Sequence, residues 1–228
     1  MSLDHIRHSV GILGKISSVF LFASPMPTFK RIIKNKSVEE FHPYPYLAAV
    51  MNCMVWIYYG MLFVHPYSIL VVIINSVGLF FHLSYLSIFF CYTVKRYRLE
   101  IVVILLAEIV GVAAIIAGTM LGLHTYASRS MVVKILATFF GILMYASPLS
   151  IMLKVIKTKS AEFLPRLLCI AGFLNGICWL IYALYKFDPY ILVGNGVGTL
   201  LAYVQLVLLH IYQKPSIVDR SHLQGRSQ

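Results

Sequence analysis

The chain contains seven apolar segments, each about as long as a helix that crosses a lipid bilayer. Such a helix needs roughly 20 mainly apolar residues to span about 30 Å of hydrocarbon. The segments lie at residues 9–29, 45–64, 67–94, 101–123, 130–153, 165–186 and 189–212. Only 12% of the 228 residues are charged, whereas a soluble domain carries about 25%. The sequence therefore predicts an all-α membrane protein with seven transmembrane helices.

Lysine and arginine are distributed unequally between the two sides that seven spans define. Five of the 19 basic residues fall on one side and 14 on the other. The larger group consists of Lys30, Arg31, Lys34, Lys36, Lys95, Arg96, Arg98, Lys154, Lys157, Lys159, Arg166, Lys214, Arg220 and Arg226. Because basic residues stay in cytoplasmic loops, we predict an external N-terminus, a cytosolic and disordered tail at 213–228, and no nucleic-acid partner.

The first and last parts of the chain are two copies of one sequence. The motif IKNKSVE at 33–39 matches IKTKSAE at 156–162. The other matching pairs are Ser24/Ser147, Pro25/Pro148, Asn52/Asn175, Trp56/Trp179, Tyr59/Tyr182, Pro66/Pro189 and, after a slip of three residues, Asn75/Asn195 and Gly78/Gly198. A duplication can serve only to build a bundle, but these residues are polar or helix-breaking, and lipid alone disfavours them.

Each copy has an odd number of spans, so the single span between the copies gives both the same direction. We predict two parallel three-helix bundles, at 9–94 and 130–212, joined by a linker helix at 101–123, a 3+1+3 arrangement. Transporters built from parallel repeats bind their substrate near the middle of the membrane, between the repeats.

Four asparagines lie within the predicted spans, where an unsatisfied amide is costly. An amide offers donors and an acceptor without charge, which suits a neutral polyhydroxylated ligand. Asn75 and Asn195 are near the middle of equivalent spans, so we expect them to face one another across the axis between the copies. Amides of this kind also tie helices together, and for the asparagines alone both explanations stay open.

The two tryptophans, Trp56 and Trp179, each follow an asparagine by four residues and share its helix face. An aromatic ring packs on the C–H faces of a sugar while neighbouring amides bind its hydroxyls. Tryptophan often marks the membrane interface, but both of these lie well inside their spans. We therefore predict a sugar site formed by Asn75, Asn195, Trp179 and Trp56.

Four prolines near the predicted cytosolic ends of the spans are candidate hinges, namely Pro25, Pro45, Pro148 and Pro165. Proline removes a backbone donor and weakens the local helix, although kinks without a function are common in spanning helices. On the other side, Tyr59 and Asp188 are candidates for a phenol–carboxylate hydrogen bond that closes the outer mouth. An exposed aspartate can also simply be solvated.

Several kinds of chemistry have no motif in this sequence. There is no Gly-rich phosphate loop, HExxH or GxSxG, and the four cysteines lack metal-ligand spacing. We predict that the chain is not an enzyme and has no metal or other cofactor. Glu108 is the one acid well within a span, and it lies in the linker, so passive transport is favoured over proton coupling.

The sequence resembles the plant SWEET sugar transporters, of the MtN3/saliva type, over residues 8–213. The resemblance rests on LFASPMPTFKRIIKNK at 21–36, Pro45-Tyr46, Asn52-Cys53, Ile74-Asn75 with Gly78, YASPL at 145–149, KTKSAEFLP at 157–165, FLNGICW at 173–179, and Asn195-Gly196. It implies a 3+1+3 fold and bidirectional uniport of sugars, often by homo-oligomers, in the plasma or vacuolar membrane. It also implies that the predicted sugar-site residues line a pocket, that the four prolines form a tetrad, and that Tyr59 and Asp188 lie at the outer gate.

Within this family, residues 51–60, 131–133 and 175–179 are most similar to the members that prefer hexoses, and disaccharides are the second choice. The chain departs from the family pattern at Lys15, His82, Lys134 and Gly194. We expect both lysines to extend toward the membrane surface. Gly194 stands where a proline is usual, and we expect it to loosen the backbone that aims Asn195.

Two other classes of membrane protein are alternatives. One is a proton-coupled carrier of the related PQ-loop type, which would move an amino acid or another small metabolite and depend on Glu108. The other is a seven-helix receptor, which an external N-terminus permits. The internal repeat and the very short loops argue against a receptor.

Overall fold

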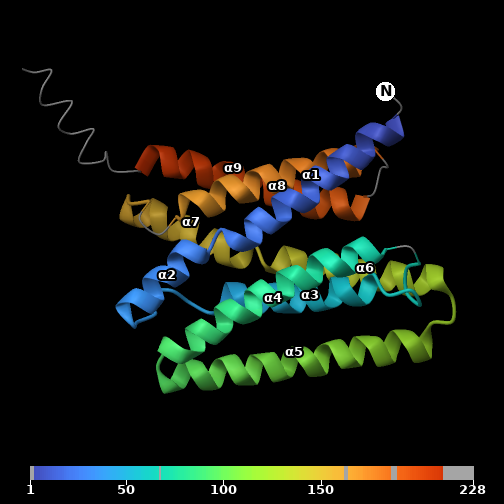
Figure 1. The fold of residues 1–228 in the computed structure, drawn as a ribbon, viewed down its shortest axis with the longest axis horizontal. Coiled ribbons are helices and arrows are strands. Elements are labelled where there is room, and N and C mark those ends of the chain that lie inside the picture. The colour runs from blue at the N-terminus through green and yellow to red at the C-terminus, as the bar shows by residue number, and fades with distance from the viewer. Residues whose placement is uncertain (1–2, 67, 162–163, 186–188, 213–228) are drawn as a thin grey trace, which may run out of the picture.

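Nine helices make up the regular structure of the described residues in this computed structural model, which are 3–66, 68–161, 164–185 and 189–212. They are α1 (Leu3–Ala23), α2 (Met26–Asn35), α3 (Tyr44–Tyr59), α4 (Ile69–Tyr92), α5 (Lys95–Gly122), α6 (Tyr126–Leu143), α7 (Ala146–Thr158), α8 (Arg166–Tyr185) and α9 (Pro189–Tyr212). Most run along the long axis of the molecule (Figure 1). The all-α prediction is confirmed.

Two predicted spans are each formed by a pair of helices. α1 and α2 meet at Ser24-Pro25, and α6 and α7 meet at Met144-Tyr145. Pro25 has no N–H to donate to Leu21 O. Ser24 donates to this carbonyl instead, through its backbone N–H at 3.2 Å and its hydroxyl at 2.6 Å. The break therefore leaves this carbonyl satisfied.

Both broken spans extend beyond the predicted ends at residues 29 and 153. α2 continues to Asn35 because Phe29 and Ile32 are buried on one face, although its basic residues are exposed. α2 and α7 then end alike, at Lys36 with φ 51° and Lys159 with φ 52°. A residue in this left-handed conformation ends a helix, and its recurrence confirms the match between the two copies in three dimensions.

Six stretches of the described residues have the length and hydropathy of a membrane span, namely Ser9–Asn35, Ile69–Tyr92, Lys95–Gly122, Tyr126–Thr158, Arg166–Tyr185 and Leu192–Tyr212. The chain is an integral membrane protein. The remaining predicted span, 45–64, contains α3, whose 16 residues correspond to about 24 Å. α3 ends at Gly60, where an added Cβ would lie 2.7 Å from Val72 Cγ2 of α4.

The two copies pack their helices in the same order. The third span of each copy is central: α4 contacts α1, α2 and α3, and α9 contacts α6, α7 and α8. Between the copies, α1 packs on α8 and α3 packs on α6 (Figure 1). α5, the linker helix, packs on α3, α4 and α6. This is the predicted 3+1+3 arrangement.

Equivalent residues form the cores of the two copies. Phe29, Ile32 and Phe89 belong to the buried cluster of the first copy. Met152, Val155 and Leu209 take their places in the second. A third cluster, which includes Val55, Tyr59, Val133 and Ala137, joins α3 to α6 across the boundary between the copies.

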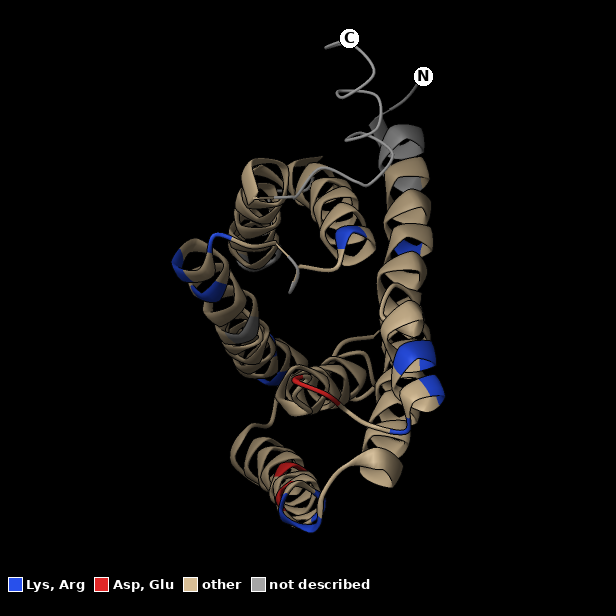
Figure 2. Cartoon of the chain, turned by 90° about the vertical axis from the view of Figure 1, so that its left-hand side faces the viewer, with Lys and Arg blue, Asp and Glu red and all other residues tan. Residues whose placement is uncertain are grey.

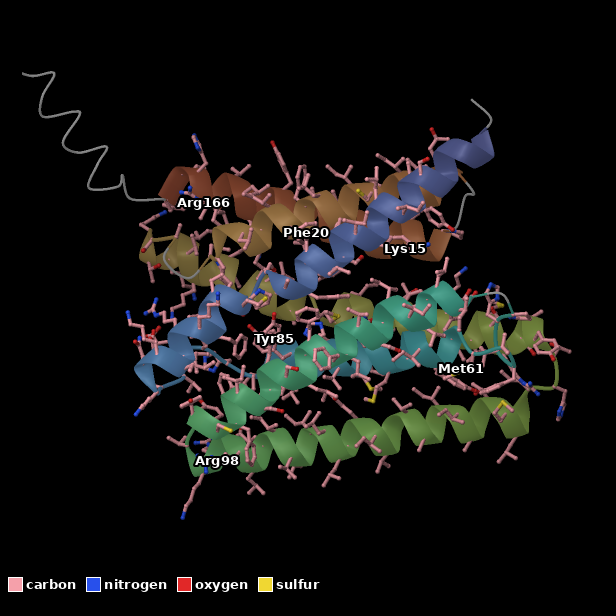
Figure 3. The ribbon with its side chains drawn as sticks, viewed as in Figure 1. Lys15, Phe20, Met61, Tyr85, Arg98 and Arg166 are labelled. Atoms are coloured by element: carbon pink, nitrogen blue, oxygen red, sulfur yellow. The ribbon has the colours of Figure 1, made fainter. Side chains whose placement is uncertain are left out.

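Basic side chains gather at one end of the molecule. Figure 2 shows this end, where several helices carry lysine or arginine residues, drawn in blue. Arg98 at the start of α5 and Arg166 at the start of α8 both lie there, whereas Lys15 and Met61 lie toward the opposite end (Figure 3). We call these the basic end and the far end.

Candidate functional site

Asn175 and Trp179 of α8 contact α1 through two serines. The hydroxyls of Ser17 and Ser18 lie 3.0 and 2.8 Å from Asn175 Oδ1. The Trp179 indole nitrogen donates a hydrogen bond to Ser18 Oγ at 3.1 Å. Neither serine was a predicted site residue, because a helical serine usually bonds only its own helix, as both also do at Gly14 O.

Close approach of α1 to α8 depends on two glycines. An added Cβ at Gly14 would lie 3.3 Å from the Trp179 ring, and one at Gly11 would lie 3.3 Å from the Tyr182 ring. The two rings pack edge to face, with centroids 5.5 Å apart. We call the contact surface between two helices of different copies a seam. The seam between α1 and α8 is therefore closely packed toward the far end.

The equivalent face of α3 lies against α6. Trp56 and Tyr59 repeat the edge-to-face pair, with centroids 5.3 Å apart. Asn52 Oδ1 lies 3.5 Å from the position of an added Cβ at Gly141. Gly141 corresponds to Ser18 in the first copy, and it has no hydroxyl. Among the described residues, the buried Asn52 Oδ1 accordingly has no hydrogen-bond partner, whereas Asn175 Oδ1 accepts from both Ser17 and Ser18.

Asn75 and Asn195 lie on the central helices α4 and α9, and both are half-buried. The Asn75 amide donates to Val71 O, one turn earlier, at 2.9 Å. The backbone carbonyl of Asn195 accepts a hydrogen bond from Thr199 Oγ1 at 2.7 Å. That the two carboxamides face each other across the axis stays a prediction.

An aromatic ring from each broken span packs on the glycine one turn after each of these asparagines. An added Cβ at Gly78 would lie 2.9 Å from Phe22 Cζ, and one at Gly198 would collide with the Tyr145 hydroxyl. The Tyr145 hydroxyl also donates a hydrogen bond to Gly194 O at 2.6 Å. The break in each span therefore touches the helix that carries the asparagine.

The four candidate hinge prolines all stand at the beginning of a helix. Pro25 precedes α2, Pro45 is in the first turn of α3, Pro148 is in the first turn of α7, and Pro165 precedes α8. The first N–H groups of a helix have no partner within it, so proline costs little there. The expected weakening inside a helix is thus confined to the two breaks, where Pro25 and Pro148 interrupt a span.

At the far end, Tyr59 is buried, and its ring stacks on His65 with centroids 4.9 Å apart. His65 Nδ1 lies 3.0 Å from Ser130 Oγ at the start of α6. The predicted partner of Tyr59, Asp188, lies outside the described residues. His65 was not a predicted site residue, but the match of Pro66 with Pro189 makes it the counterpart of Asp188, so the repeat was the signal that could have marked it.

The positions that depart from the family pattern have distinct surroundings. His82 packs edge to face on Phe22, with centroids 5.6 Å apart, and its Nδ1 has no partner among the described residues. Lys15 and Lys134 are partly exposed. The expected loosening at Gly194 is opposed by the hydrogen bond that its carbonyl accepts from Tyr145.

Glu108 lies on the linker helix, beside a cavity of about 400 Å³ between α5 and the seam of α3 with α6. Met51 and Phe140 also line this cavity. Glu108 Oε2 is buried without a hydrogen-bond partner among the described residues. Asn75 and Asn195 are not part of the lining of this cavity.

The sequence matches the profile of the MtN3/saliva family, described as "Sugar efflux transporter for intercellular exchange", over residues 8–97 and 131–216. The chain belongs to this family. The two matched stretches coincide with the two copies and leave out most of α5, so each copy is by itself an MtN3/saliva unit.

Relatives cover nearly the whole chain. A bidirectional sugar transporter, SWEET7b of Oryza sativa subsp. indica, is 50% identical over 214 residues, which are 94% of this chain and 80% of the relative. SWEET5 of Arabidopsis thaliana, also named a bidirectional sugar transporter, is 47% identical over 208 residues, which are 91% of this chain and 87% of the relative. The predicted family is confirmed.

A solved structure has the same fold. It is the 3.7 Å resolution structure of a eukaryotic SWEET transporter, with a TM-score of 0.81 and 33% identity. The match covers 92% of this chain and 98% of that chain. MtN3/saliva proteins are transporters, in agreement with the prediction that the chain is not an enzyme.

Proposed function

We propose that this protein moves sugars in both directions across a membrane, down their gradient, as a facilitative uniporter. The observation that carries the proposal is the 50% identity, over 94% of the chain, with a relative named a bidirectional sugar transporter. A hexose such as glucose is the proposed substrate. Trp56 supports a monosaccharide, since its bulky ring reduces the room for a second sugar unit.

Asn75, Asn195, Trp179 and Trp56 are the proposed sugar-binding residues. Trp179 supports this role because its indole nitrogen is held by Ser18 at 3.1 Å, which fixes the plane of a ring on which a sugar can pack. Asn75 and Asn195 supply neutral donors and acceptors on the central helices. A pre-oriented ring and amides reduce the entropy lost on binding.

Alternating access is proposed to result from rocking of the two bundles, 9–94 and 130–212, which 101–123 joins. The described seams, α1 on α8 and α3 on α6, are closed by their Trp–Tyr pairs toward the far end. This supports a conformation that opens toward the basic end. Pro25, Pro45, Pro148 and Pro165 are the proposed hinges, and Tyr59 with Asp188 the outer gate.

The basic end is proposed to face the cytosol, because lysine and arginine stay preferentially in cytoplasmic loops. This orientation places the N-terminus outside and the tail 213–228 in the cytosol. We propose the plasma membrane as the location, with the vacuolar membrane as the alternative, and a homo-oligomer as the assembly, both on the resemblance to SWEET transporters.

Flux of labelled glucose into and out of proteoliposomes tests this function. Transport should proceed in both directions, reach equilibrium without a pH gradient, and be abolished by Asn75→Ala and by Asn195→Ala. Asn35→Ala is the matched control, since Asn35 is exposed and bonds Glu39 at the basic end. Flux that survives both site variants would refute the site, and flux that collapses with an ionophore would favour a proton-coupled carrier.

A further inference from the structure

Tyr145 links the break of the second broken span to the turn that carries Asn195. It lies directly before α7, with φ −74° and ψ −10°. Its hydroxyl donates to Gly194 O at 2.6 Å, and Gly194 immediately precedes Asn195. In a regular helix this carbonyl accepts only the backbone N–H of Gly198, four residues later. The Tyr145 hydroxyl is therefore an additional donor to the same carbonyl.

The Tyr145 ring fits only because residue 198 is a glycine. A Cβ there would lie 3.0 Å from Tyr145 Cζ and 3.2 Å from Cε1, besides colliding with the hydroxyl. Tyr145 therefore contacts α9 at two glycines one turn apart. Its hydroxyl bonds Gly194, its ring packs on Gly198, and Asn195 lies between them. Three glycines, Gly194, Gly196 and Gly198, make this turn the most deformable part of the helix, since each lowers helix stability by about 1 kcal/mol relative to alanine.

The first copy makes the same link with different atoms. Phe22, the counterpart of Tyr145, packs on Gly78 but has no hydroxyl, and residue 74 is an isoleucine in place of Gly194. Here Tyr85 of α4 donates to Phe22 O at 2.8 Å. In a continuous helix that carbonyl would accept from Met26, beyond the break. In both copies a hydrogen bond thus joins the break to the asparagine-bearing helix.

We propose that Tyr145 is a positioning residue for sugar binding. Its hydroxyl fixes the Gly194–Gly198 turn and thereby aims the Asn195 carboxamide at the sugar. The inference rests on the proposed function, in which Asn195 binds the sugar. Because Tyr145 stands at the break itself, a bend of α7 against α6 also moves the ring that holds this turn, so hinge motion and sugar affinity are coupled.

Equilibrium binding of glucose to the purified protein, measured by calorimetry, tests the hydroxyl. Tyr145→Phe keeps the ring and should weaken binding about threefold to tenfold, the value expected for one hydrogen bond. The maximal flux in proteoliposomes should change by less than about twofold. Tyr203→Phe is the control, because it removes a hydroxyl from the same helix while its ring packs on Phe173.

A double-mutant cycle separates positioning from a general structural role. In the Asn195→Ser background, Tyr145→Phe should have no further effect on glucose binding, because the group that it aims is gone. In the Asn75→Ser background it should keep its full effect. An equal loss in all backgrounds would overturn the inference, as would unchanged binding by Tyr145→Phe. A wild-type protein that does not bind any sugar would instead overturn the proposed function.

A second variant keeps the test decisive if Tyr145→Phe does not fold. Gly198→Ala displaces the ring by the added methyl group and should reproduce the weaker binding. Gly196→Ala is its matched control, since a Cβ there would be 3.7 Å from Leu180 Cδ1, an ordinary contact. Equal affinity for the two alanine variants would overturn the inference.

Discussion

The Trp179 indole nitrogen donates a hydrogen bond to the Ser18 hydroxyl across the boundary between the two copies, at 3.1 Å. The same hydroxyl lies 2.8 Å from Asn175 Oδ1. One small side chain of α1 thus serves both polar residues of the α8 face. The seam between α3 and α6 has Gly141 at the equivalent position. The two seams are therefore alike in shape, but the seam between α1 and α8 is more polar.

Ser18→Ala should lower the free energy of unfolding by about 1–3 kcal/mol, because it leaves the Trp179 N–H and Asn175 Oδ1 with fewer partners in a buried place. Thermal unfolding in detergent micelles measures the change. Ser87→Ala is the control, since Ser87 is exposed and bonds only its own helix at Leu83 O. Equal midpoints for the two variants would contradict the importance of the Ser18 network.

Gly141→Ser should give Asn52 the partner that Asn175 already has. The distance of 3.5 Å between Asn52 Oδ1 and an added Cβ leaves room for the side chain. We expect a gain of about 1 kcal/mol in stability and slower transport, because the α3–α6 seam must part during the cycle. Gly141→Ala isolates the gain in helix propensity. The hydrogen bond is absent if serine is no more stabilising than alanine.

Gly176→Ala should destabilise the contact of α8 with α9. The added Cβ would collide with Thr199 Oγ1 and lie 3.2 Å from the Thr199 Cα, which cannot move freely. Overpacking of this kind costs about 1–3 kcal/mol. Gly118→Ala in α5 meets nothing within 4 Å and should be neutral or stabilising. The comparison, by chemical or thermal unfolding, fails if both variants behave alike.

Glu40 and Lys154 form an ion pair between the two copies at the basic end, with an N–O distance of 2.8 Å. The hydrogen bond from Lys154 holds the pKa of Glu40 below its ordinary value of 4.5, with smaller effects of the charges of Lys154 and His42. The carboxyl pKa is lowered in the folded state, so the contribution of the pair is complete above the ordinary pKa and is lost as the pH falls through the lowered one.

Glu40→Gln should therefore shift the unfolding midpoint slightly downward at about pH 7 and not at all in strong acid. Both side chains are largely exposed, so the effect should be small and should shrink further in about 1 M NaCl. Glu100→Gln is a comparison that does not join the two copies, since Glu100 of the linker helix bonds Tyr44 of the first copy and Arg96 of its own helix. A Glu40→Gln shift that persists in acid would assign it to another cause.

Glu108→Gln should leave glucose flux within about twofold of the wild type, because the residue lies on the linker, outside the seams that are proposed to move. Flux measured with and without a pH gradient checks this expectation. Loss of flux in the variant, together with a dependence on the gradient, would support the proton-coupled alternative.

The duplication made most of the fold predictable. Pro25 and Pro148, Asn52 and Asn175, and the two tryptophans recur at constant spacing, so the copies and their common direction follow from the sequence. The position of the second break did not follow, since the helix stops at Met144-Tyr145 and not at Pro148. A proline ring clashes with the carbonyl four residues earlier, which here belongs to Met144.

The ends of the broken spans were misplaced for a related reason. Hydropathy falls at the basic residues of α2 and α7, but Phe29 and Ile32 stay buried and carry α2 on to Asn35. The pairing of Ser18 with Trp179 and of Tyr145 with Gly194 could not be read from the chain either. Such contacts depend on which face of one helix meets another, and periodicity does not specify the partner.

The packing of α5 makes the two halves of the molecule mechanically unequal. α5 lies along α3 and α4, and among the described residues its main contact with the second copy is with α6. The first copy is thus supported by a fourth helix, whereas α7, α8 and α9 have no comparable packing on α5 among the described residues. For the proposed rocking cycle we therefore expect the C-terminal copy to move more than the first copy, which the linker helix stiffens.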